Sequence, residues 1–259
     1  MFGIIGGSGL AKLAALESPQ RRVMRTPYGE PSGALSFGRL AGQEIVFVAR
    51  HGYGHTIAPH QVNYRANVWA LKELGVEGIF AMATVGGIRA DLDPGSLLVP
   101  DQILDYTHSR EATFFERGEP VTHIDFTHPY TQALRQRLLA AAGRLGETLL
   151  DGGTYACMQG PRLETAAEIN RVERDGAHVV GMTGMPEAVL AREAGLAYAA
   201  LCVVVNHAAG RGQSKASVEL ASFEALQEKT VGRAVRVLAD AISATASQDT
   251  TAKAKEATS

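Results

Sequence analysis

The chain has few cysteines, no long apolar run and no excess of either charge. Its two cysteines, Cys157 and Cys202, each lie in an apolar stretch, which excludes a disulfide framework and a thiol-rich metal site and predicts reduced core thiols. The formal net charge is −2 and 20% of the residues are charged, so no basic field exists to hold nucleic acid or an anionic membrane. A small-molecule partner is therefore expected.

The N-terminus also lacks the features of a targeting or membrane segment. Its first residues, MFGIIGGSG, contain neither a basic stretch nor an apolar run long enough to cross a bilayer. We therefore expect a cytoplasmic protein that stays where it is made. With 259 residues, the chain is long enough to bury a substantial core.

Short runs of branched aliphatic residues alternate with segments whose apolar residues recur at helical spacing. Strands are predicted at residues 2–5, 44–49, 78–83, 96–99, 179–182 and 198–205. Helices are predicted at residues 63–74, 129–145, 165–175, 186–194 and 223–241. This order predicts one α/β domain over residues 1–243, with ligand sites at loops leaving the strand ends. Residues 244–259, rich in Ala, Thr, Ser and Lys, are predicted to form a disordered tail.

Several polar residues follow predicted strands, where side chains emerge at one edge of a sheet. Ser8 lies in a glycine turn whose backbone N–H groups suit an oxyanion. Arg50 and His51 follow the next strand and suit a phosphate dianion. Thr84 lies in a predicted glycine turn at 83–87, and Thr183 follows a later strand at the start of a helix. Each feature alone also fits a structural turn, but their convergence favours one shared anion site.

Two further positions combine a polar side chain with the end of an element. Glu164 stands at the opening of a helix, where a carboxylate interacting with the helix dipole is a common alternative. Asn206 follows a strongly apolar strand and equally fits a loop cap. A metal site at His51, His55 and His60 is disfavoured, because the segment has no acidic ligand and its spacing matches no familiar zinc pattern.

Five segments resemble the trimeric purine nucleoside phosphorylase and methylthioadenosine phosphorylase family in order and spacing. They are IIGGSGL at 4–10, RHG at 50–52, VNYRANVWAL at 62–71, QGPR at 159–162 and GMTGMPE at 181–187. The resemblance runs from Phe2 to about Leu238, and it implies a single α/β domain with a central mixed, twisted sheet flanked by helices. Within the family, residues 182–187 and 204–210 are most similar to the bacterial S-methyl-5′-thioinosine phosphorylases.

The resemblance also implies where the sugar and the anion bind. Phosphate would be held by Ser8, Arg50, His51, Ala83, Thr84 and Thr183. Ala83 departs from the hydroxyl or amide often found in the family, so Thr84 is expected to compensate. Met182 would pack beneath the ribose. The family further implies a homotrimer, in which His123 reaches a neighbouring subunit's 5′ pocket, and inorganic phosphate as co-substrate without an organic cofactor or metal.

The base pocket implied by the resemblance suits a 6-oxopurine. The Glu164 carboxylate can accept from purine N1–H, and the Asn206 amide can donate toward N7 and O6. Methylthioadenosine phosphorylases typically carry aspartates at the positions of Asn206 and Ala208, and neither is acidic here. At the 5′ end, Val218 favours a methylthio group over a hydroxyl, whereas His207 nearby could restore a polar contact.

We therefore expect phosphorolysis of S-methyl-5′-thioinosine to hypoxanthine and 5-methylthioribose 1-phosphate. Asn206 would stabilise the departing purine, and Glu164 would orient it. Phosphorolysis of inosine and guanosine or of methylthioadenosine stays open as an alternative. Hydrolysis by water and a noncatalytic nucleoside-binding module built on the same fold also stay open.

Overall fold

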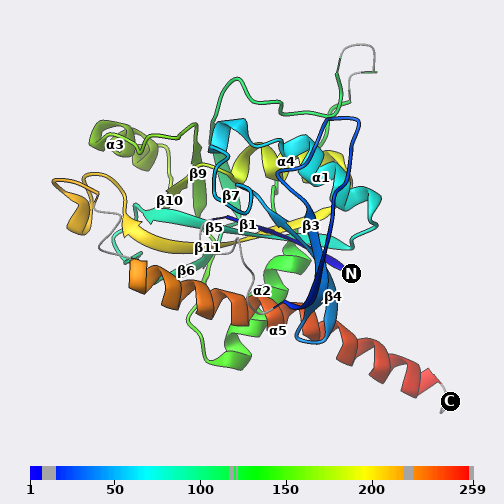
Figure 1. Cartoon of the computed structure of the whole chain (residues 1–259). Helices are drawn as coiled ribbons and strands as arrows, with labels where there is room; N and C mark the ends of the chain where they lie inside the picture. Colours follow the sequence, from blue (N-terminus) through cyan, green and yellow to red (C-terminus); the bar gives the residue numbers. More distant parts are fainter. Residues whose placement is uncertain (8–15, 117–119, 121, 219–223, 257–259) are drawn as a thin grey trace.

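Figure 1 shows the computed structural model, in which one twisted sheet lies between two layers of helices. The structure describes residues 1–7, 16–116, 120, 122–218 and 224–256. Within these residues, eleven strands form a mixed sheet in the order β2-β3-β4-β1-β5-β10-β9-β7, with β11 paired to β5 and β6, and β8 paired to β6. The predicted fold class, a single α/β domain with a central mixed sheet flanked by helices, is confirmed.

Each strand and helix predicted from periodicity is present. The strands are β1 (Phe2–Gly6), β2 (Glu17–Arg22), β3 (Leu35–Leu40), β4 (Gln43–Ala49), β5 (Gly78–Gly87), β6 (Leu97–Val99), β7 (Gln102–Tyr106), β8 (Leu150–Asp151), β9 (Thr154–Met158), β10 (Val179–Gly181) and β11 (Ala197–His207). The helices are α1 (Tyr64–Glu73), α2 (Gln132–Leu145), α3 (Ala166–Arg174), α4 (Gly184–Glu193) and α5 (Glu224–Glu256), with 3-10 turns η1 (Pro59–Gln61) and η2 (Gly212–Ser214). Helix α5 continues past its predicted end at 241, through most of the segment predicted as a tail.

Strand alternation sends neighbouring side chains into two cores, one on each face of the sheet. In β1, Ile5 belongs to the cluster that contains Leu71 of α1 and Leu190 of α4. The preceding residue, Ile4, belongs to the cluster that contains Leu138 of α2. Figure 1 shows the same division, with α1 and α4 on one side of the sheet and α2 and α5 on the other. Burial on both faces explains why the central strands are continuous apolar runs in the sequence.

The predicted glycine turn at 83–87 is wrong, because β5 continues as a strand to Gly87. Gly86 and Gly87 pair with β10 on one side and β11 on the other. A Cβ on Gly87 would lie 2.2 Å from the carbonyl oxygen of Leu92. Glycine therefore permits close approach of the backbone here rather than a change of direction.

One edge of β5 changes partner part-way along its length. Strand β1 pairs with β5 up to Met82, in parallel, and β10 pairs with it from Gly86, antiparallel. Residues 83–85 therefore have neither strand beside them on that edge. Such a break in the strand order is where α/β proteins bind ligands.

No helix in the described ranges is long and apolar enough to cross a membrane, α5 included.

Candidate functional site

A cavity of about 760 Å³ opens at this change of partner in the sheet. The structure brings five residues of the predicted anion site to its wall, namely Arg50, His51, Ala83, Thr84 and Thr183. It brings five residues of the predicted nucleoside site to the same wall, namely Glu164, Met182, Asn206, Ala208 and Val218. Loops from both halves of the chain thus enclose one space that can hold a nucleoside beside an anion.

Two of the predicted site residues that the structure describes, His123 and His207, do not line this cavity. Ser8 lies outside the described residues. His207 is buried away from the cavity, with its Nε2 atom 3.0 Å from an Asp93 carboxylate oxygen. His123 is exposed and does not line the cavity of this subunit. The His207 ring, which could have restored a polar contact at the 5′ end, is directed to Asp93 instead.

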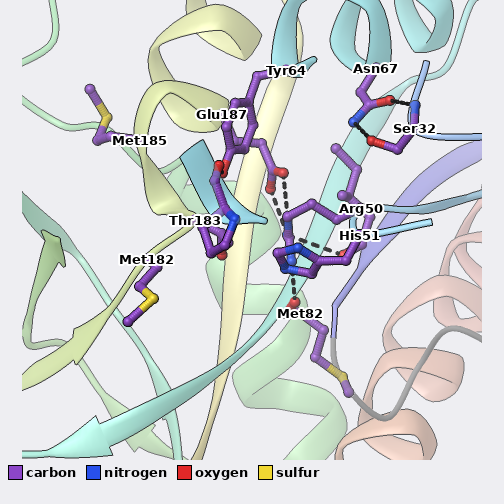
Figure 2. A network of polar contacts seen from close by, with 12 residues as sticks. Ser32, Arg50, His51, Tyr64, Asn67, Met82, Met182, Thr183, Met185 and Glu187 are labelled. Atoms are coloured by element: carbon purple, nitrogen blue, oxygen red, sulfur yellow. Dashed lines mark hydrogen bonds and ion pairs between the residues drawn. The ribbon is translucent and has the colours of Figure 1, made fainter. Parts of the chain in front are cut away.

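Arg50 is held rigidly behind the cavity by a carboxylate that sequence reasoning did not identify. Its guanidinium donates from Nε to Oε2 of Glu187 at 2.7 Å and from Nη2 to Oε1 at 2.8 Å, and both side chains are almost fully buried. A third bond runs from Nη1 to the Met82 carbonyl oxygen at 3.0 Å (Figure 2). The Tyr198 hydroxyl also donates to Glu187. Burial alone would lower the pKa of Arg50, but Glu187 raises it above its ordinary value.

The signal that could have found Glu187 is its charge within an apolar helix. It lies in α4 among buried residues, and it is only 1% exposed. A buried carboxylate is rarely stable without a cationic partner, so its presence in that pattern predicts a buried pair. The sequence does not say which arginine that partner is.

His51 lies beside Arg50 and keeps a neutral ring. Its Nδ1 atom is 2.8 Å from the carbonyl oxygen of Ile57, and its ring centroid is 4.7 Å from that of His55. Burial and then the Arg50 charge lower the pKa of His51 from 6.5 to about 4. Because a carbonyl oxygen only accepts, Nδ1 carries the ring hydrogen and Nε2 presents a lone pair.

Glu164 is not occupied with capping the helix that follows it. Thr165 is the N-cap of α3, and Glu168 completes a capping box with it, so the helix terminus is already satisfied. The Oε1 atom of Glu164 is buried and has no hydrogen-bond donor among the described residues. Burial, followed by the Glu168 charge, raises the pKa of Glu164 above its usual range. The Oε1 atom of Glu164 is therefore available to accept a hydrogen bond from a ligand in the cavity.

Asn206 faces the cavity because of a bulge in β11. The register against β5 shifts between Val204 and Asn206, so the consecutive residues Val205 and Asn206 both line the cavity. The Asn206 Nδ2 atom donates one hydrogen to the His207 carbonyl oxygen at 2.6 Å. That bond fixes the orientation of the amide and leaves one N–H and the Oδ1 atom for a ligand.

Arg110 links the loop of Gln159 to the segment of Met182 and Met185 through its hydrogen bonds, and sequence reasoning also missed it. Its Nη1 atom donates to the carbonyl oxygens of Met182 and Met185 at 2.9 and 2.6 Å. Its Nη2 atom donates to the Gln159 carbonyl oxygen at 2.7 Å. Gly160 follows Gln159, and a Cβ at this position would lie 2.5 Å from the Met182 sulfur. Glycine therefore leaves room for Met182, the residue predicted to pack beneath the ribose.

Metal ligands are not grouped in the described part of the chain. No set of three or more His, Cys, Asp or Glu side chains there is arranged to hold an ion. Both cysteines are free and buried, which confirms the prediction of core thiols.

Known proteins resemble this chain over most of its length. The family model described as "Phosphorylase superfamily" matches residues 1–243. A Pseudomonas syringae pathovar tomato protein named "Probable S-methyl-5′-thioinosine phosphorylase" is 52% identical over 94% of this chain and 99% of its own length. A Thermococcus kodakarensis protein named "Probable 6-oxopurine nucleoside phosphorylase" is 48% identical over 83% of this chain and 82% of its own. The structure of methylthioadenosine phosphorylase from Schistosoma mansoni in complex with adenine has a TM-score of 0.90 and 32% identity, covering 99% of this chain and 96% of that one.

Proposed function

This chain belongs to the phosphorylase superfamily, and on that premise we propose that it catalyses phosphorolysis of S-methyl-5′-thioinosine to hypoxanthine and 5-methylthioribose 1-phosphate. One observation carries the proposal: the buried Oε1 atom of Glu164, which receives no hydrogen bond from the described residues, lines the same cavity as the Arg50 guanidinium. The name of the Pseudomonas syringae relative supports the same reaction.

The base end of the cavity matches an oxygenated purine. Hypoxanthine has a donor at N1, whereas adenine has an acceptor there, so only hypoxanthine can pair with Glu164 Oε1 through N1. Leaving that buried oxygen unpaired costs about 1–3 kcal/mol, enough for a clear preference. Asn206 adds a free N–H for N7 or O6, and Ala208 has no carboxylate to receive a 6-amino group.

The anion end supplies the attacking group. A phosphate oxygen attacks C1′ while the bond to the purine breaks, so positive charge grows on the ribose and negative charge on the purine. The bound dianion stabilises the ribose, and the Asn206 N–H stabilises the purine. Thr183 stands at the N-cap of α4 without a side-chain cap bond and lines the cavity, so its hydroxyl is placed to donate to the anion. Catalysis then comes from position and charge, without a covalent enzyme intermediate.

The 5′ end favours a thioether over a hydroxyl. Val218 is half-buried at the cavity wall and offers no hydrogen-bonding group. The nearby His207 is engaged with Asp93, so it does not supply a polar contact in place of the valine. A methylthio group makes no strong hydrogen bonds with water, so it loses none when it packs against Val218. A 5′-hydroxyl would lose its hydrogen bonds with water and find no replacement in the valine side chain.

Inosine and guanosine form the second candidate substrate class. They present the same base edge to Glu164, and the 48% identical relative is named for 6-oxopurine nucleosides. Inosine differs from S-methyl-5′-thioinosine only at the 5′ position, where Val218 is the discriminating contact, whereas guanosine also carries a 2-amino group.

An assay across three nucleosides tests the proposal. Base release is measured from S-methyl-5′-thioinosine, inosine and S-methyl-5′-thioadenosine, with and without added phosphate. We expect strict dependence on phosphate and a kcat/KM at least roughly tenfold higher for methylthioinosine, a difference of about 1.4 kcal/mol. Faster release of adenine would contradict the base assignment, and release without phosphate would mean hydrolysis. Tight nucleoside binding without turnover would mean a noncatalytic module.

The same proposal includes three finer features. The protein is a homotrimer in which the exposed His123 reaches the 5′ pocket of a neighbouring subunit. It acts in the cytoplasm, on a nucleoside and inorganic phosphate, without nucleic acid or membrane. It needs no organic cofactor and no metal. Sedimentation of the purified protein tests the trimer, and an unchanged rate after chelation tests the independence from metal.

A further inference from the structure

Arg50 and His51 converge on one point of the cavity with opposite hydrogen-bonding roles. The reference point is Gly7, directly after β1. A Cβ built there would lie 3.0 Å from the Arg50 Nη1 atom, and 3.7 and 3.8 Å from the His51 Cδ2 and Nε2 atoms. Because residue 7 is glycine, this space belongs to the cavity, whose wall contains all three residues.

Arg50 contributes a donor but little net charge at this point. Its Nε and Nη2 atoms are bonded to Glu187, and the paired carboxylate compensates the guanidinium charge. The Nη1 atom carries two hydrogens, of which one goes to the Met82 carbonyl oxygen. The second hydrogen is left for a ligand beside Gly7. The site therefore distinguishes between two anions of the same charge by the hydrogen-bond donors and acceptors that each anion offers.

His51 contributes an acceptor at the same point. The Ile57 carbonyl oxygen, 2.8 Å from Nδ1, requires the ring hydrogen on Nδ1. The neighbouring charged or titratable groups are Arg50, on one side, and His55, whose ring stands 4.7 Å away. Both groups lower the pKa of His51, so neither favours a second ring proton. The Nε2 atom therefore presents a lone pair to the cavity.

From this geometry we propose that the anion site is specific for a tetrahedral oxyanion that carries a proton, and that His51 Nε2 accepts the hydrogen of that P–OH group. Hydrogen phosphate and hydrogen arsenate offer both an acceptor for Arg50 and a donor for His51. Sulfate offers acceptors only, so one of its oxygens would face the Nε2 lone pair. The inference deepens the proposed function, on which it rests, by naming the protonation state of its co-substrate.

The direct test is anion binding to the purified protein without nucleoside. Isothermal titration at about pH 8, where phosphate and sulfate are both mainly dianions, gives the ratio of their dissociation constants. We expect phosphate and arsenate to bind roughly ten to a hundred times more tightly than sulfate, as for one unpaired polar group. Equal affinity for phosphate and sulfate would overturn the inference.

A matched pair of variants and a proton count make the test specific. In His51→Gln the amide can rotate to offer an N–H, so the preference for phosphate over sulfate should fall to within about threefold. His60→Gln is the control, because His60 is exposed and does not line the cavity, and it should keep the wild-type ratio. A wild-type ratio in His51→Gln would contradict the role of His51.

The proton count needs no variant. Titrations of the wild-type protein in two buffers with different ionisation heats give the number of protons taken up with phosphate. We expect none. Uptake close to one proton would show that His51 becomes a cation and would overturn the inference. If neither anion binds, the proposed phosphorolysis fails as well, whereas equal binding of both with normal phosphorolysis removes this inference alone.

Discussion

Glu187 and Arg50 face each other as a buried bidentate pair, with both carboxylate oxygens bonded to the guanidinium. The pair sets the position of the one arginine nitrogen that points into the cavity beside Gly7. Rigidity at this point favours an anion site, because the donor does not have to be ordered when the anion binds.

Glu187→Gln should destabilise the fold and make it depend on phosphate. Removing one partner of a buried ion pair costs about 3–5 kcal/mol, because the other charge stays buried without compensation. Bound phosphate would supply the missing negative charge, so it should raise the midpoint of urea unfolding more in the variant than in the wild type. Asp240→Asn, in an exposed pair with Arg144, is the control and should cost less than about 1 kcal/mol. Equal midpoints for wild type and Glu187→Gln would refute the structural role of this pair.

The Glu164→Gln variant should be more stable than the wild type but less active. The burial that raises the pKa of this carboxyl disfavours its charged form in the folded protein, so the stability it supports is greatest at low pH and declines as pH rises. At neutral pH the neutral amide should therefore unfold at a higher urea concentration. Because a neutral amide oxygen accepts more weakly than a carboxylate and the amide can also turn its N–H groups toward N1–H, kcat/KM for 6-oxopurine nucleosides should fall by roughly ten- to a hundredfold. A variant that is less stable and equally active would contradict both assignments.

Asn206→Ala should lose most turnover while phosphate binding persists. Removing a donor that stabilises developing charge typically lowers kcat by about a hundredfold or more. The anion contacts lie on other loops, so titration with phosphate should give an unchanged dissociation constant. Asn170→Ala, at an exposed amide bonded to Arg211, should behave as wild type in both measurements. Near-normal turnover in Asn206→Ala would remove the residue from the mechanism.

His51 should make the fold sensitive to acid. Its pKa in the folded protein is about 4, below the ordinary 6.5, so between these values the unfolded chain binds more protons. The free energy of unfolding should hence be at its full value above about pH 6.5 and fall as the pH drops toward 4. In His51→Gln this slope should be shallower, whereas His60→Gln should retain it. Urea unfolding at several pH values between 7 and about 4 measures the slope, and parallel curves for all three proteins would refute the assignment.

The helices and the strands β1, β4, β5, β6, β10 and β11 could be predicted because their apolar spacing reflects two covered faces of a sheet. Strands β2, β3, β7, β8 and β9 were not predicted; in β2, all six residues are exposed and the sequence, ESPQRR, has no apolar periodicity. The turn expected at Gly86 and Gly87 was wrong for another reason. A glycine pair marks a turn or a close approach equally well, and only the position of the Leu92 carbonyl oxygen decides between them.

The candidate site was predictable where polar residues follow apolar strands, as at Arg50, His51, Thr183 and Asn206. The residues that hold these side chains in place could not be predicted, because they lie far from them in the sequence. Glu187 is 137 positions from the arginine it holds, and the carbonyl oxygens held by Arg110 lie on loops up to 75 positions away. Such contacts depend on the order of strands in the sheet, which a local pattern does not specify. The bulge that turns Asn206 into the cavity is likewise a property of strand register.

The two buried thiols give the protein a practical property in solution. Burial raises the pKa of both Cys157 and Cys202 to about 12, so neither is a thiolate at neutral pH and neither is open to a reagent in the folded chain. Maleimide or iodoacetamide labelling should thus report only molecules that have opened. A cysteine introduced on the surface can carry a fluorophore or spin label without replacement of the natural pair.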